Sequence, residues 1–222
     1  MRHEYKHRIT YEDYLVIKSR LKHLAKPDAH AGSDGQYTIH SLYFDNLSDK
    51  ALREKLDGVD KREKFRIRYY NDDTDYIRLE KKSKIHGLCE KQSAPLSKEE
   101  VMKICNGDIS FLLKSGKPLL QELYAKMKYQ MLKPKVIVDY EREPYVYDPG
   151  NVRVTFDKNI RTSLYHDRFF DGEYCSAPAE EGCIILEVKY DAFLPEIIEK
   201  AVRVPNRQAS AFSKYAVCRK FG

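Results

Sequence analysis

Apolar and polar residues alternate along several stretches of this chain, a period of two that is typical of β-strands with one buried face. Alternation, or enrichment in β-branched and aromatic residues, predicts strands at residues 4–8, 36–44, 64–70, 76–84, 87–93, 135–143, 151–157 and 183–190. The turn-like run Asn71-Asp72-Asp73 between two of these stretches indicates a β-hairpin. The pattern therefore favours a sheet dominated by antiparallel strands.

Helices are predicted between these strands by capping residues and by apolar residues at helical spacing. They are expected at residues 10–26, 48–56, from 97 onward, and at 118–132, 195–202 and 210–220. Thr10, Ser48 and Ser97 are the predicted N-caps, and Pro118 suits a first helical position. The run Glu143-Pro144-Tyr145 is interpreted as a turn. Strands and helices together indicate one mixed domain over residues 1–222.

Composition narrows the class of protein. The 17 Tyr and 9 Phe supply enough bulk for a packed core, which argues against a disordered chain. No apolar run approaches the roughly 20 residues of a membrane-spanning helix, and the first residues do not resemble a signal peptide. The five cysteines are odd in number and lack a CxxC spacing, so a reducing, cytoplasmic location is expected. The net charge of +6 predicts an anionic partner.

Every one of the charged strands carries a basic residue on its polar face, as in Arg66-Ile67-Arg68. One interpretation is an ordinary solvent-facing side of an antiparallel sheet. The other is the lumen of a barrel whose apolar side packs outward against helices, through Phe65, Ile67, Val154, Phe156, Leu186 and Val188. A lumen rich in cations would be costly without a polyanion, with a metal on its carboxylates.

Seven short motifs then carry a resemblance. They are Glu4-Tyr5-Lys6, Ser41-Leu42-Tyr43-Phe44-Asp45, Arg66-Ile67-Arg68, Leu79-Glu80-Lys81-Lys82, Tyr140-Glu141-Arg142, Leu186-Glu187-Val188-Lys189 and Ser213-Lys214-Tyr215. In this order the sequence resembles the VTC domain, the polyphosphate-polymerase branch of the triphosphate tunnel metalloenzymes, which are relatives of the CYTH proteins. The resemblance implies an α+β fold: an antiparallel β tunnel barrel with helices packed outside.

The resemblance also implies a reaction and a site. The γ-phosphate of ATP would pass to a growing inorganic polyphosphate chain inside the tunnel, with Mn²⁺ or Mg²⁺ as cofactor. The positively charged catalytic residues would be Lys6, Arg66, Arg68, Lys82, Arg142 and Arg153. Further phosphate contacts would be Lys91, Lys189, Ser213 and Lys214, and the metal ligands Glu187, Glu4 and Glu80. A bulge near Lys81, Lys82 and Lys84 would change which lysine faces inward.

Two departures from the hydrolase pattern favour the polymerase branch. CYTH hydrolases carry Glu-x-Glu-x-Lys in the first strand, where this chain has Glu4-Tyr5-Lys6, and the late pair reads Glu187-x-Lys189. A tunnel triphosphatase that uses water as acceptor stays an alternative. A non-catalytic polyanion-binding module is the other, although carboxylates among the cations argue against a nucleic-acid binder, and no nucleic acid is expected. With no membrane segment of its own, the chain would need a separate partner for any coupling to a membrane.

Overall fold

The computed structural model describes residues 3–86, 88–171, 176–204 and 212–221. The chain divides into two compact units. Unit 1 comprises Met1–Thr38, Tyr140–Ile160 and Glu180–Ser213, and unit 2 comprises Ile39–Asp139, Arg161–Ala179 and Lys214–Gly222. Three strands, β3 (Tyr37–Asp45), β7 (Lys133–Tyr147) and β8 (Val152–Ser163), contribute residues to both units, so the units are interleaved along the sequence.

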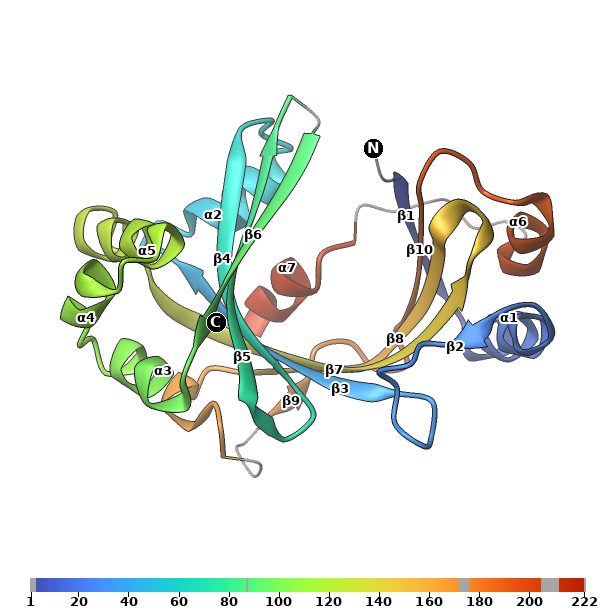
Figure 1. The fold of residues 1–222 in the computed structure, drawn as a ribbon, viewed down its shortest axis with the longest axis horizontal. Helices are drawn as coiled ribbons and strands as arrows, with labels where there is room; N and C mark the ends of the chain where they lie inside the picture. The colour runs from blue at the N-terminus through green and yellow to red at the C-terminus, as the bar shows by residue number, and fades with distance from the viewer. Residues whose placement is uncertain (1–2, 87, 172–175, 205–211, 222) are drawn as a thin grey trace. The chain divides into compact units, whose positions relative to one another are not determined.

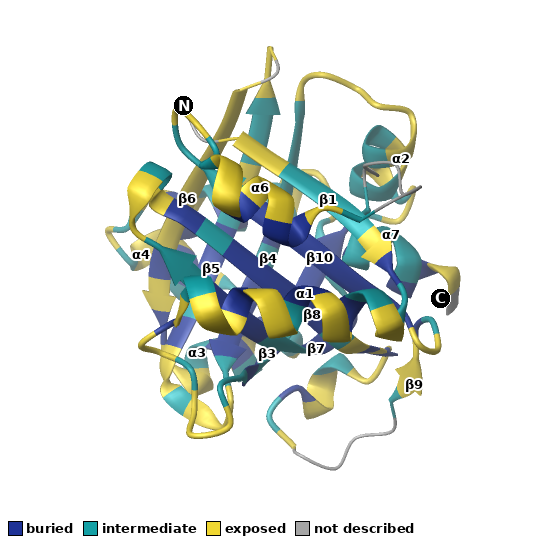
Figure 2. Ribbon diagram, turned by 90° about the vertical axis from the view of Figure 1, so that its right-hand side faces the viewer, coloured by how far each residue is buried: buried dark blue, intermediate teal, exposed yellow. Residues whose placement is uncertain are grey.

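The sheet of unit 1 has the strand order β1-β10-β8-β7, with β1 at His3–Ile9, β10 at Ile184–Tyr190 and the short β2 (Lys26–Pro27) beside β7. Helices α1 (Tyr11–Leu24) and α6 (Glu196–Val202) lie across one face of these strands, over the buried residues of β8 and β10 (Figure 2). Val154, Phe156, Leu186 and Val188 pack in this core with helix residues such as Ile17 and Ile198. The expected packing of these four residues against helices is confirmed.

In unit 2 the strand order is β7-β3-β4-β5-β6, with β4 at Arg62–Tyr70, β5 at Asp73–Ile85 and β6 at Leu88–Leu96. Helices α3 (Lys98–Cys105), α4 (Ser110–Lys114) and α5 (Pro118–Tyr129) cover one face of this sheet (Figure 1). Phe65 and Ile67 are buried among Val101, Ile104 and Leu120, as predicted. Burying each such side chain stabilises the fold by about 1.5–3 kcal/mol.

The remaining elements of unit 2 are short. They are α2 (Lys50–Leu56), β9 (Ala177–Pro178), α7 (Lys214–Cys218) and the 3₁₀ turns η2 (His166–Arg168) and η3 (Arg219–Phe221), and unit 1 adds η1 (Pro149–Asn151). The predicted strands and the helices that begin after Thr10 and Ser97 are confirmed, and both residues form capping boxes. The class, α+β with antiparallel pairing, is as expected.

Two local predictions are wrong. Ser48 does not cap α2; Asp45, at the end of β3, accepts hydrogen bonds from the backbone N–H groups of Ala51 and Leu52 and so caps the first turn from another element. The stretch interpreted as a turn at Pro144 is part of β7, because β2 pairs with that segment and the Tyr145 ring is buried in the core of unit 1. The short α4 and β2 had no sequence signal that we recognised. Residues 210 and 211 of the last predicted helix lie outside the described residues, Phe212 and Ser213 are not helical, and the rest of that helix is α7 with η3.

Candidate phosphate and metal sites

One face of the unit 2 sheet collects most of the cations predicted there. Residues opposite each other on antiparallel strands share a face. The register pairs Tyr43 with Arg66, Arg66 with Glu80, Ser41 with Arg68, Lys64 with Lys82, and Lys82 with Lys91. We call this set the arginine face: Ser41, Tyr43, Lys64, Arg66, Arg68, Glu80, Lys82 and Lys91. It lies on the side of β4 opposite to Phe65 and Ile67, which pack against the helices.

Arg66 is held on two sides of its guanidinium group. Nε and Nη2 contact Oε2 of Glu80 at 2.7 and 2.6 Å, and Nη1 donates to the phenolic oxygen of Tyr43 at 2.9 Å. Glu80 also forms an ion pair with Lys91. Burial disfavours the charged form of Glu80, but the positive charges of Arg66, Arg68 and Lys91 outweigh it and lower its pKa to about 2. Glu80 is therefore ionised at neutral pH and orients Arg66.

Arg68 is buried, and its Nε donates to Oγ of Ser41 at 3.0 Å. Tyr43 is the other polar side chain that β3 adds to this face. Burial opposes ionisation of its phenol, but the charges of Arg66, Lys64 and Arg68 lower the pKa of Tyr43 to about 7. A phenol that ionises near neutral pH reports a strongly positive environment. The arginine face is thus prepared for anions.

The register also decides between the three neighbouring lysines. Pairing of β4 with β5 is continuous from Arg62 to Arg68, so Lys82 and Lys84 share the face of Arg66. Lys81 lies on the opposite face, where it forms ion pairs with Glu122 of α5 and with Glu63. Lys82, the predicted residue, is therefore placed with the arginines.

The second group of predicted residues lies on one face of the unit 1 sheet. Lys6 is opposite Glu187 and Glu187 opposite Thr155, while Glu4 is opposite Lys189 and Lys189 opposite Arg153. Asp157, two residues after Thr155, shares their side of β8. With Arg142 of β7, which contacts this set, they form what we call the carboxylate face: Glu4, Lys6, Arg142, Arg153, Thr155, Asp157, Glu187 and Lys189.

Ion pairs form a chain across the carboxylate face. Nζ of Lys6 lies 2.7 Å from Glu4, and Nζ of Lys189 lies 3.6 Å from Glu4 and 2.6 Å from Glu187. Burial opposes ionisation of Glu4, but the charges of Lys6 and Lys189 lower its pKa. The chain continues to Arg142, whose Nη2 lies 3.4 Å from Glu187.

Arg142 is anchored by a second carboxylate. Its Nε and Nη2 donate to the two oxygens of the fully buried Asp157 at 2.7 and 2.8 Å, the bidentate geometry that arginine favours. Burial alone would lower the pKa of Arg142, but the charge of Asp157 raises it well above its usual value. Arg142 therefore carries a permanent charge in one orientation.

Two buried polar atoms on the carboxylate face have no hydrogen-bond partner within the described residues. They are Nε of Arg153 and Oγ1 of Thr155. Nη2 of Arg153 contacts Asp28 and the Tyr37 hydroxyl, each at 2.9 Å. Because buried polar atoms are nearly always satisfied, these two are suited to a polar ligand.

The carboxylates suit a hard divalent cation that shares its coordination with a substrate. Mg²⁺ and Mn²⁺ prefer oxygen ligands, and Mg²⁺ is usually held by one or two carboxylates together with substrate phosphates. Glu4 and Glu187 lie on adjacent strands, both within ion-pair distance of Lys189. Within the part of the chain that the structure describes, no three His, Cys, Asp or Glu side chains gather into a larger ligand group. The donors thus fit an ion completed by phosphate oxygens.

The other predicted phosphate contacts lie near the C-terminus. Lys214 is the first residue of α7 and belongs to unit 2, whereas Ser213 closes unit 1. Their role in phosphate binding stays a prediction. That residues of both faces line one lumen also stays a prediction, because these residues belong to different units.

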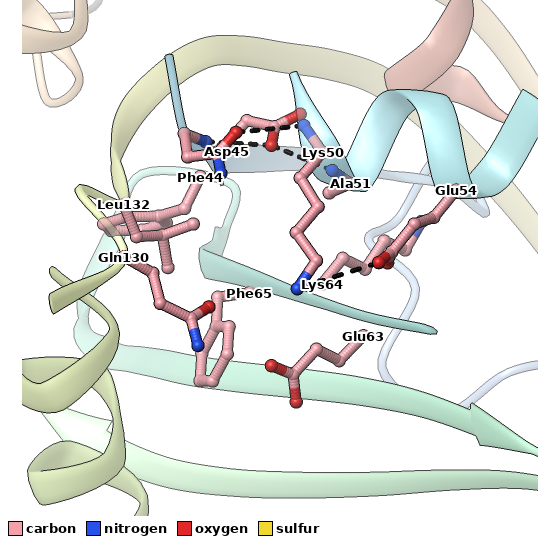
Figure 3. A pocket seen from close by; sticks show the side chains of 11 residues that line it. Phe44, Asp45, Lys50, Ala51, Glu54, Glu63, Lys64, Phe65, Gln130 and Leu132 are labelled. Carbon is pink, nitrogen blue, oxygen red and sulfur yellow. Dashed lines mark hydrogen bonds and ion pairs between the residues drawn. The ribbon is translucent and has the colours of Figure 1, made fainter. Parts of the chain in front are cut away.

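A small pocket in unit 2 lies beside the arginine face (Figure 3). It is lined by Phe44, Asp45, Asn46, Lys50, Ala51, Glu54, Glu63, Lys64, Phe65, Gln130 and Leu132. Of the residues on the arginine face, Lys64 is the one that also lines it. Lys50 pairs with Glu54, one turn along α2, at 3.8 Å, and Asp45 is occupied in capping α2. Lys50, Glu54, Asp45 and Glu63 all have partners, the last in Lys81 and Lys126, so we assign the pocket no catalytic role.

Sequence reasoning missed five residues that the structure places on the two faces: Ser41, Tyr43, Lys64, Thr155 and Asp157. Tyr43 and Ser41 stood in a recognised motif but were assigned no role. Thr155 and Asp157 were recognised as polar positions of an alternating strand. Their proximity to particular arginines depends on strand pairing, which the period of two does not specify.

A family model shows the family of this chain, and solved structures show its fold. The family model of the VTC domain matches residues 1–221. A solved structure from Hippeastrum, provisionally assigned as an adenylyl cyclase and described as having dominant triphosphatase activity, is similar with a TM-score of 0.61 and 16% identity, covering 100% of this chain and 96% of that one. A provisionally assigned adenylate cyclase from Bacillus halodurans has a TM-score of 0.50 and 14% identity, covering 84% of this chain and 78% of that one.

The two solved structures confirm the predicted fold. At such low sequence identity, structural similarity is evidence for the fold alone. No curated protein matches the chain. None of the helices in the described ranges combines the length and the apolar character needed to cross a membrane.

Proposed function

This chain belongs to the VTC domain family, and from that premise we propose that it is a metal-dependent phosphotransferase that extends inorganic polyphosphate with the γ-phosphoryl group of ATP. The bond between the γ-phosphorus and the β,γ-bridging oxygen breaks, and a terminal oxygen of the polyphosphate forms the new bond to phosphorus. ADP leaves with the bridging oxygen. The polyphosphate is one phosphate longer.

The observation that carries this proposal is the arginine face. Arg66 and Arg68 are fixed by side chains of neighbouring strands, with Lys64, Lys82 and Lys91 around them. Phosphoryl transfer demands little covalent work from a protein, and mainly requires that phosphates be positioned and their charge neutralised. Guanidinium groups held in place before binding meet both requirements.

The reaction also requires a divalent cation, and we propose that the cation binds at the carboxylate face. We assign Glu187 and Glu4 as the ligands, with phosphate oxygens completing the coordination. The ion would neutralise charge on the transferred phosphoryl group. Lys6, Lys189, Arg142 and Arg153 surround these carboxylates and would bind the remaining phosphate oxygens. Glu80, also predicted as a ligand, lies between Arg66 and Lys91, and we propose that it mainly orients Arg66.

A triphosphatase is the second candidate. It is favoured by the Hippeastrum structure, which shares the fold over the whole chain and is described as a triphosphatase. The same phosphate contacts would serve, with water in place of polyphosphate as the acceptor. The bases at Lys6 and Lys189, where hydrolases of the fold carry carboxylates, favour a longer polyanion as acceptor and so support the polymerase.

One incubation separates these candidates. The chain is given ATP and Mn²⁺, with and without a short polyphosphate primer, and the products are resolved as polyphosphate or free phosphate. Polyphosphate supports the proposal, and free phosphate alone supports the triphosphatase. Binding of tripolyphosphate without turnover would leave only a polyanion-binding module.

Two variants test the assignment of the faces. Glu187→Gln should lose metal-dependent turnover while tripolyphosphate affinity stays the same or rises, because a negative charge is removed from a cationic surface. Arg66→Ala should weaken binding and turnover together, by about 1.5–3 kcal/mol for a charged hydrogen bond. Glu196→Gln, an exposed carboxylate paired with Lys200, is the control. Full metal-dependent activity in Glu187→Gln would contradict the metal assignment.

A further inference from the structure

Tyr43 lies at the centre of the arginine face but has no assigned role. Its ring is 4% exposed and sits on β3 directly across from Arg66. The carboxylate of Glu80 contacts the Nε and Nη2 side of the Arg66 guanidinium, and the Tyr43 oxygen accepts a hydrogen bond from Nη1. Two partners on different sides define the plane of the guanidinium group, which one partner alone would leave free to tilt.

The groups around Tyr43 are mainly positive. From β4, Nζ of Lys64 and Cζ of Arg66 lie 5.3 and 5.8 Å from the centre of its ring, and Arg68 adds a third charge. Although burial opposes ionisation, these charges lower the pKa of Tyr43 to about 7. Both the phenol and the phenolate are therefore accessible near neutral pH.

The remaining neighbour is Tyr215 of α7, whose ring centre is 5.0 Å away. Tyr215 donates its hydroxyl to Asp45, and burial together with that carboxylate raises the pKa of Tyr215, against the smaller opposing effect of Arg219. Tyr215 stays neutral, so Tyr43 is the tyrosine of this pair that changes its charge.

We propose that Tyr43 is a positioning residue for phosphate binding: its neutral phenol orients Arg66 toward a phosphate anion, and its ionised form competes with that anion for Arg66. Tyr43 thereby makes phosphate affinity fall as the pH rises through neutrality. This inference rests on the proposed binding of phosphates at the arginine face. It adds a residue that neither the sequence motifs nor the comparisons assign to the site.

The test compares tripolyphosphate binding to the full chain and to Tyr43→Phe by calorimetry, at about pH 6 and about pH 8.5, on either side of neutrality. Phenylalanine keeps the ring and its contacts with the cations but removes the oxygen. At the lower pH the variant should bind about tenfold more weakly, the loss of a hydrogen bond to a charged group. At the higher pH the difference should shrink to less than about threefold, because the wild-type phenolate opposes the anion.

Tyr69→Phe is the matched control. Tyr69 is a buried tyrosine of β4 on the opposite face, its hydroxyl donates to the carbonyl of Phe169, and burial raises its pKa. Its variant should keep the wild-type affinity and pH dependence. Comparing each variant with wild type in the same buffers also cancels the titration of tripolyphosphate itself.

Each result decides the proposal. Equal affinities of wild type and Tyr43→Phe at both pH values, or the same loss at both, would overturn it, since a purely structural role carries no pH dependence. If wild type does not bind tripolyphosphate at all, the proposed function itself fails, and the role of Tyr43 with it. Should the variant not fold, ultraviolet titration of wild type replaces it: tyrosinate must appear near neutral pH and be suppressed by tripolyphosphate, and its absence would overturn the proposal.

Discussion

Arg66 and Arg142 are both predicted phosphate-binding residues, but the two units hold them differently. Arg66 on the arginine face contacts one carboxylate, Glu80, and a phenolic oxygen. Arg142 on the carboxylate face contacts two carboxylates, Asp157 through a bidentate pair and Glu187 at 3.4 Å. The same side chain therefore faces one carboxylate in unit 2 and two carboxylates in unit 1.

The difference shows how arginine residues on β-strands can form two kinds of site. Each carboxylate beside a guanidinium group offsets part of the local positive potential, whereas a hydroxyl partner orients the group without adding negative charge. The arginine face thus keeps a positive potential for anions. The carboxylate face sets Glu4, Asp157 and Glu187 against its cations, which suits a divalent ion bound together with phosphates.

The largest expected effect concerns the stability of the carboxylate face. Asp157→Asn leaves Arg142 buried without its main counter-charge, and breaking a buried pair in this way should cost about 3–5 kcal/mol. Denaturant unfolding measures this cost. Asp191→Asn, at a half-buried aspartate that accepts a hydrogen bond from Asn151, should change stability less. If Asp157→Asn were as stable as wild type, the carboxylate anchor would not distinguish Arg142 from Arg66.

Acid should destabilise the arginine face through Glu80. Its pKa is about 2 in the folded protein against a usual value of 4.5. A lowered folded pKa stabilises the protein above the unfolded pKa, and that contribution, on the order of 3 kcal/mol, is lost as the pH falls from about 4.5 to about 2. In Glu80→Gln, the free energy of unfolding should fall less steeply as the pH is lowered over this range. If the variant lost stability with falling pH as steeply as wild type, the cations around Glu80 would not stabilise its ionised form.

Tripolyphosphate should stabilise the folded protein, because the positive potential of the arginine face is relieved when an anion binds. At a hundredfold excess over the dissociation constant the gain should be about 2.7 kcal/mol, measured as a rise in melting temperature. Arg68→Gln should reduce this gain, while Glu187→Gln should retain it when no metal is added. A larger loss in Glu187→Gln than in Arg68→Gln would reverse our assignment of the two faces.

The smallest effect separates two adjacent lysines. Lys82→Gln should weaken tripolyphosphate binding about threefold, since an exposed cation contributes roughly 0.2–1 kcal/mol. Lys81→Gln should leave the affinity unchanged, because Lys81 points to the helix side and pairs with Glu63 and Glu122. Titrations of both variants at one salt concentration compare them. Equal weakening would place both lysines on the same face, contrary to the register.

Much of the site could be predicted because alternation along a strand is a local property. Arg66 and Arg68 differ by two residues and lie on the polar side of β4, with Phe65 and Ile67 on the helix side, as the pattern required. The VTC resemblance added the identity of the family, which the match over residues 1–221 confirms. The assignment of individual site residues to phosphate or metal remains a prediction that the variants above test.

The residues that sequence reasoning missed depend on contacts that strand pairing and strand ends create. Tyr43 precedes Arg66 by 23 positions, and Asp45, which caps α2, replaced Ser48 because the end of β3 lies beside the first turn of that helix. The choice between Lys81 and Lys82 needed the absence of a bulge between Arg62 and Arg68. Such facts follow from how strands pair and where they end, and local residue preferences carry no record of either.

By itself, the sequence of this protein determined which side chains share a face of each strand, which segments begin as capped helices, and the family to which the chain belongs. The tertiary structure decided which strands are neighbours, and so which acid or hydroxyl meets each arginine. The physical reason is one of range. Side-chain alternation comes from backbone geometry within a few residues, whereas the charge state of Tyr43 and the orientation of Arg142 come from burial and from charges on strands brought together by the fold.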